Sequence, residues 1–132
     1  MELGRGAKAV SWAGQLLAAA ILAQTLFFKF TGAPESVYIF STLGMEPWGR
    51  IGTAVMEAVA VVLLLVPRTS AIGAGLALGL MAGAIFFHLT RLGIEVQGDG
   101  GLLFKLALVV TAAAGVVLVL RRKELPLVGG LL

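Results

Sequence analysis

Four long apolar stretches constrain the fold of this chain more than any other feature of its sequence. They cover residues 9–30, 49–66, 70–92 and 102–120. Each is close to the roughly 20 residues that cross the hydrocarbon core of a bilayer as a helix. Because lipid offers no hydrogen bonds, the backbone amides of a single span have to be paired within that span, as a helix pairs them. The sequence therefore predicts an all-α polytopic membrane protein, with one domain over residues 1–132.

The composition agrees with a membrane protein and excludes several classes of function. Hydrophobic residues make up 59% of the chain and charged residues only 13%, whereas a soluble domain is about half apolar and a quarter charged. With no cysteine and a single histidine, the chain cannot form disulfides, iron–sulfur clusters, Cys-ligated zinc or bis-histidine haem sites. We find no nucleotide-binding loop, nucleic-acid-binding stripe or catalytic constellation, so we expect neither an intrinsic cofactor nor intrinsic enzyme activity.

The connections between the stretches predict how the helices are arranged. They are short and rich in glycine and proline, which is typical of an antiparallel four-helix bundle. The first connection is the longest, and within it Val37, Phe40 and Leu43 would share one helix face. Pro34 also suits the first turn of a helix. We therefore expect a short amphipathic helix at about 34–43, on the outer surface or folded over the bundle mouth.

The positions of the lysines and arginines predict the orientation in the membrane. One side would carry Arg5, Lys8, Arg68, Arg121, Arg122 and Lys123. The other would carry Lys29, Arg50, Arg91 and Lys105, which lie inside or at the edges of the stretches. The positive-inside rule then places both termini in the cytoplasm, and we expect a bacterial inner or plasma membrane. A signal peptide is the alternative for the first stretch, but its apolar run is longer than usual for one.

The third stretch carries small residues at a regular helical spacing. Ala71, Gly75, Gly79 and Gly83 recur at every fourth position. Helices in lipid associate through close fit, and small residues allow their backbones to approach. This pattern predicts a groove that receives a neighbouring helix of the bundle, or alternatively a helix of another protein.

Ionisable residues inside the stretches are the main candidates for function. Each costs roughly 2.5–3.5 kcal/mol at the centre of a membrane helix. Glu57 is the deepest, about 10 Å below the outer rim at 1.5 Å per residue from Arg50. Thr53 lies on the same helix face as both. A carboxylate at this depth needs a partner or a proton, because burial disfavours its charged form.

Polar groups from all four stretches are expected at this same outer level, whereas the inner half is almost entirely hydrocarbon. This asymmetry predicts a polar pocket that opens to the outer side and is sealed towards the cytoplasm. Its expected residues are Lys29, Glu35, Arg50, Thr53, Glu57, His88, Arg91 and Lys105. The alternatives are cations that extend to lipid headgroups, and a purely structural ion pair of Glu57. No helix carries metal-ligand spacing, so we predict no metal site.

The order of these residues resembles the DoxX-like family of small four-span membrane proteins. The resemblance covers about Leu16 to Arg121. It is carried by Lys29-x-x-Gly32-x-x-Glu35, the Ile51-Gly52 pair followed by Glu57, Pro67, and Met81-x-x-Ala84 through His88. It implies a fold and a membrane location. It also implies varied roles: subunits linked to thiosulfate:quinone oxidoreduction, partners in oxidative-stress complexes, and assembly chaperones for ligand-gated channels.

These observations favour a binding or accessory membrane protein whose outer pocket receives an amphipathic small molecule, such as a quinone or a lipid. In this interpretation Glu57 and His88 position or exchange a proton, and the cations hold an anionic or carbonyl oxygen. A membrane subunit of a quinone-linked redox complex and a membrane-protein assembly chaperone are the alternatives. The bilayer is the expected partner, together with a membrane partner subunit or a second copy of the chain, and no nucleic acid is expected.

Overall fold

The computed structural model describes residues 3–126, and within them it contains helices and no strand. The long helices are α1 (Arg5–Thr31), α3 (Trp48–Leu65), α4 (Ser70–Phe87) and α5 (Leu102–Arg121), and a short helix α2 (Pro34–Thr42) lies between the first two. The turns are η1 (Pro67–Thr69), η2 (His88–Leu92) and η3 (Arg122–Glu124). The end of the predicted domain, 127–132, lies outside the described residues.

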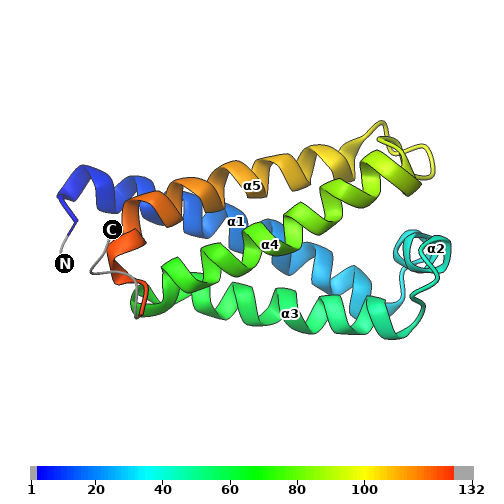
Figure 1. Ribbon diagram of the computed structural model, residues 1–132, viewed down its shortest axis with the longest axis horizontal. Helices are drawn as coiled ribbons and strands as arrows, with labels where there is room; N and C mark the ends of the chain where they lie inside the picture. Colours follow the sequence, from blue (N-terminus) through cyan, green and yellow to red (C-terminus); the bar gives the residue numbers. More distant parts are fainter. Residues whose placement is uncertain (1–2, 127–132) are drawn as a thin grey trace.

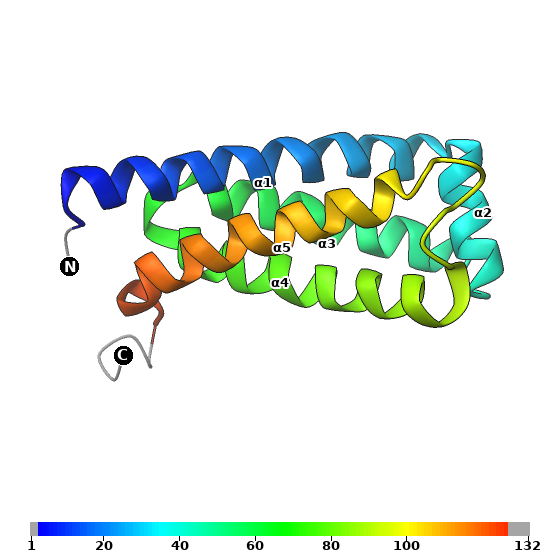
Figure 2. The same ribbon diagram turned by 90° about the horizontal axis from the view of Figure 1, so that it is seen from above.

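The four long helices form an antiparallel bundle in which each contacts two neighbours, in the cyclic order α1, α3, α4, α5. Figures 1 and 2 show the start of α1, the turn η1 and the end of α5 at one end of the bundle, and α2 lying across the other. Four helical segments of the described chain are long and apolar enough to cross a membrane. The predicted fold class is confirmed, and the helices support an integral membrane location.

The predicted amphipathic helix is α2, and it takes the second of its two expected positions. Pro34 occupies its first turn, where the missing amide hydrogen costs nothing. Phe40 is buried, and Ile39, Phe40 and Leu43 line a cavity below it. The helix therefore covers the bundle mouth and does not lie apart on the membrane surface.

Two helix boundaries differ from those predicted. Helix α1 begins at Arg5 and not near residue 9, because a helix can continue beyond the edge of the hydrocarbon layer. The third predicted span is divided, since α4 ends at Phe87 and the chain continues as a π-helical turn to Leu92. Gly93 ends this turn with a positive φ of 81°, a conformation that glycine adopts at little cost.

The glycine groove predicted to receive a neighbouring helix of the bundle does not do so. Ala71 is buried, but Gly75, Gly79 and Gly83 are exposed. A Cβ atom built on any of these three glycines would meet nothing within 4 Å. A helix that is apolar on almost every side carries no pattern that says which face points inward.

The close approach of α4 to α3 occurs instead at Gly73. A Cβ atom there would lie 2.7 Å from the backbone nitrogen of Leu64 and 2.9 Å from the carbonyl carbon of Leu63. The inward face of α4 continues through Ala74 and Ala77, which are fully buried. Small residues therefore do mediate the packing, but on a different stripe of the helix.

Candidate functional site

A cavity of about 590 Å³ lies in the half of the bundle that α2 covers. All four long helices and α2 contribute to its wall, which is mostly apolar. Its deep part is lined by Leu22, Met81 and Val110, from three different helices. Its size falls within the range of small-molecule binding sites.

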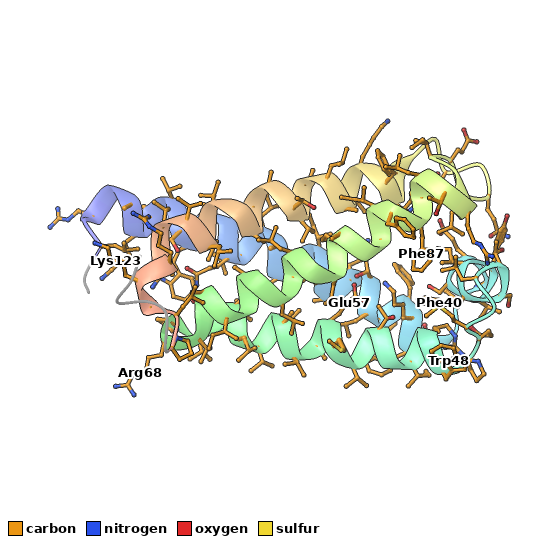
Figure 3. The ribbon with its side chains drawn as sticks, viewed as in Figure 1. Phe40, Trp48, Glu57, Arg68, Phe87 and Lys123 are labelled. Atoms are coloured by element: carbon orange, nitrogen blue, oxygen red, sulfur yellow. The ribbon has the colours of Figure 1, made fainter. Side chains whose placement is uncertain are left out.

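Glu57 supplies the buried charge of this cavity. The residue is 2% exposed, and its Oε1 atom lies 3.0 Å from Nζ of Lys29 on α1. The other oxygen, Oε2, accepts a hydrogen bond of 3.2 Å from the hydroxyl of Thr25. Figure 3 shows Glu57 between the α3 and α4 ribbons, on the side towards α2.

One oxygen of this carboxylate has no hydrogen bond from the described residues. The ammonium of Lys29 is close enough to Oε1 for an ion pair, but its direction does not meet hydrogen-bond geometry, and Oε1 is fully buried. Oε1 is therefore held by the charge of Lys29 and can accept a further hydrogen bond from a group in the cavity.

His88 is the second polar residue of the wall, and the π-helical turn places it there. The residue is 5% exposed, and its Nδ1 atom lies 2.9 Å from the carbonyl oxygen of Gly93. A carbonyl only accepts, so Nδ1 carries the hydrogen, and Nε2 is an acceptor when the ring is uncharged. The edge of the ring also packs against Phe104, with 5.5 Å between the centroids. Turns of π-helix are frequent at functional sites.

Five of the eight residues predicted for the pocket line the cavity. They are Lys29, Glu35, Thr53, Glu57 and His88. The other three were wrong as pocket residues. Arg50 donates hydrogen bonds to the carboxylate of Glu46 and to the carbonyl oxygen of Lys29, whereas Arg91 and Lys105 are exposed. The position of a residue along a helix predicts its depth in the membrane, but it does not predict whether the side chain faces the cavity.

This placement changes the chemistry expected of the site. Lys29 is the one lysine or arginine among the described lining residues, and it is engaged by Glu57. Glu35 and Glu57 add carboxylates, and His88 adds a lone pair. The site therefore offers more acceptors than cations, in contrast to the cation-rich pocket that the sequence predicted for an anionic or carbonyl oxygen.

The inner half of the bundle is not the hydrocarbon layer that the sequence predicted. The side-chain oxygen of Gln15 accepts hydrogen bonds from Ser11 and Arg121, and its nitrogen donates to Ser70 and to the carbonyl oxygen of Leu64. Arg121 also bonds to Ser11 at 2.6 Å and pairs with Glu124 at 3.2 Å. This inner cluster joins α1, α5 and the α3–α4 turn near the chain ends.

The sequence does carry a signal for this inner cluster. Ser11 and Gln15 are four residues apart on α1, so they share a helix face. Both are fully buried. Arg121 was interpreted only as an orientation signal, whereas burial and hydrogen bonds give it a packing role.

Among residues 3–126, no three His, Cys, Asp or Glu side chains gather in a way that could hold a metal ion. Comparison of the chain with protein-family models, with curated proteins and with solved structures found no match.

Proposed function

We propose that this chain is a DoxX-like membrane binding or accessory protein that holds the head of an amphipathic small molecule, such as a quinone or a lipid, in the cavity under α2. The observation that carries the proposal is Oε1 of Glu57, a fully buried carboxylate oxygen that has an ion-pair partner but no hydrogen bond among the described residues, in a wall that is otherwise mostly apolar. A ligand head with a hydroxyl group would supply this hydrogen bond.

The contacts favour a head that can donate hydrogen bonds. Oε1 of Glu57 and Nε2 of His88 would each accept from a hydroxyl group, and Lys29 would donate to a neighbouring oxygen of the same head. An apolar tail would lie against the deep part of the cavity wall. Because a purely anionic head would meet two carboxylates and a single lysine, it is disfavoured.

We also propose that the α2 end faces outward and that both termini lie in the cytoplasm. Lys8, Arg68 and Arg121 lie around one hollow at the end of the chain termini. Figure 3 shows Arg68 and Lys123 at that end and Trp48 at the other. Basic residues accumulate on the cytoplasmic side of membrane proteins, which supports this orientation.

The binding proposal is tested with protein extracted gently into nanodiscs. Native mass spectrometry should detect a small amphipathic molecule on the wild type, with occupancy reduced about tenfold in Glu57→Gln and His88→Ala, which corresponds to about 1.4 kcal/mol of lost affinity. Lys105→Ala is the matched control, because Lys105 is exposed and does not line the cavity. Equal occupancy in all four proteins, or no bound molecule on any of them, would overturn the proposal.

A further inference from the structure

The exposed residues of the cavity wall fall into two separate groups. Phe28, Pro34 and Gln97 lie at the end of the bundle that α2 covers. Gly79 lies near the middle of α4, and Gly83 lies four residues before α4 ends at Phe87. Two exposed glycines in the cavity wall point to a second opening of the cavity, on the side of the bundle.

The second opening lies on the side of α4 that faces α3. Figure 1 shows these two helices close together near η1 and separating towards the end where α2 lies. Gly73 holds them in contact at the closed end, through its approach to Leu64. Further along, the cavity is lined on α4 by Leu80 and Ala84, which are neighbours of the two glycines, and on α3 by Glu57.

Gly79 and Gly83 have no side chains that could narrow this opening. Cβ atoms on Gly79 and Gly83 would meet no other atom within 4 Å, so the space in front of both glycines is open. The opening lies in the middle part of a helix apolar enough to span a membrane, so it faces lipid and not water. A bulky side chain at either position would fill it without a clash inside the bundle.

We infer that this opening is a lateral portal, through which a membrane-dissolved ligand with a single apolar tail enters from the bilayer and keeps its tail in the lipid. The inference rests on the proposed function, and it names the ligand class of that site: an amphiphile with a hydroxyl head and not a water-soluble solute. Lipid is as apolar as the cavity wall, so the tail loses no hydrophobic free energy on entry. The head gains a hydrogen bond to Oε1 of Glu57, which has none from the described residues.

The test fills the portal and uses a glycine of the same helix as the control. Gly79→Leu and Gly83→Leu place a branched side chain in the opening. Gly75→Leu adds the same side chain one turn away, where a Cβ also meets nothing and the residue does not line the cavity. The probes are 4-dodecylphenol and phenol, added to the protein in phosphatidylcholine nanodiscs, with occupancy measured by native mass spectrometry.

We expect dodecylphenol occupancy to fall about tenfold in Gly79→Leu and Gly83→Leu and to be unchanged in Gly75→Leu. Phenol, which has no tail and can enter through the outer opening, should bind equally to all of them. Thermal unfolding of the three variants provides the folding control. If both filled variants bind dodecylphenol like the wild type while Glu57→Gln loses it, the portal is wrong and the proposed function stands.

Two further results would also overturn the inference. Equal losses in all three leucine variants would show that the whole glycine stripe seats another helix. A wild-type protein that binds neither dodecylphenol nor any co-purifying molecule would remove the proposed function and the portal together.

Discussion

At the scale of single residues, the ion pair of Lys29 and Glu57 contributes both to the stability of the bundle and to the candidate site. The two side chains come from different helices and lie 3.0 Å apart, with Glu57 almost fully buried. A buried charged group has lost its contacts with water, so its stability depends strongly on its ion-pair partner. The pair therefore holds α1 to α3 and keeps a carboxylate in the cavity wall.

Replacing the lysine should expose this dependence. We expect Lys29→Met to lower the stability by about 3 kcal/mol, since it leaves a buried carboxylate without its cation. The double variant Lys29→Met/Glu57→Met should recover most of the loss, because two apolar residues of similar size replace the pair. Thermal unfolding in detergent measures both effects. Lys105→Met, at an exposed position, is the control, and an equal effect of the two single variants would contradict the prediction.

Depth along a helix was predictable from the sequence, whereas direction around the helix was not. Glu57 and Lys29 were expected at one level and do meet. Arg50 was expected in the pocket, but its guanidinium bonds to the last turn of α1 and to Glu46. Its role is to hold the end of the helix that carries Lys29.

At the scale of helices, the packing of α4 depends on one glycine and not on the more regular stripe beside it. Gly73→Ala should destabilise the protein, because its Cβ would lie under 3 Å from backbone atoms of α3. Gly75→Ala should be neutral or stabilising by up to about 1 kcal/mol, since alanine favours helix more than glycine does. Thermal unfolding of the two variants compares them directly. If Gly75→Ala were the more harmful change, the assignment of the packing face would be wrong.

The start of α5 depends on Asp99, which lies in the loop between α4 and α5. Its carboxylate accepts hydrogen bonds from the backbone amides of Val96, Gly101 and Leu103, at 2.8 to 3.2 Å. Burial acts to raise the pKa of Asp99, but these hydrogen bonds outweigh it, and the net pKa is lowered. The carboxylate therefore contributes stability in its charged form.

This shift predicts a pH dependence with a definite sign. A carboxyl group whose pKa is lower in the folded state stabilises the protein fully above its unfolded pKa of about 3.9. This stabilisation is lost as the pH falls through the pKa of the folded state. Asp99→Asn should therefore lower the stability at pH 7 and flatten the loss of stability below about pH 4. Unfolding measured from pH 7 to pH 2.5 checks this. An unchanged acid limb in the variant would contradict it.

At the scale of the whole molecule, the bundle is held at both ends by buried polar contacts. The end covered by α2 has the pair of Lys29 and Glu57. The inner cluster around Gln15 joins α1 to Arg121 of α5 and to Ser70 at the start of α4. Between them the helices pack through small and branched apolar residues.

Removing the centre of the inner cluster should weaken the whole bundle. Gln15→Leu leaves several buried groups without a partner, so we expect a loss of about 2–3 kcal/mol. Gln24→Leu is the matched control, because Gln24 is an exposed glutamine of the same helix. Thermal unfolding measures both. Equal stability of the two variants would show that the inner cluster contributes nothing.

The orientation can be measured cleanly because the chain has no cysteine of its own. In intact cells, a membrane-impermeant maleimide should label Gln97→Cys, which is exposed at the α2 end. Lys123→Cys, at the end of the chain termini, should be labelled only after the cells are opened. The reverse pattern would mean that the cavity opens towards the cytoplasm.

The sequence by itself determined the four spans, their antiparallel order, the short helix after the first span and the depth of Glu57. These follow from local quantities: the length of apolar runs, turn residues, and position along a helix. The tertiary structure alone decided which face of each helix points inward. It separated Gly73 from the glycine stripe, placed Arg91 and Lys105 outside the cavity, and gathered the inner cluster. The physical reason is that in such an apolar chain both faces of a helix are apolar, so only the packing of the helices against one another decides which face points inward.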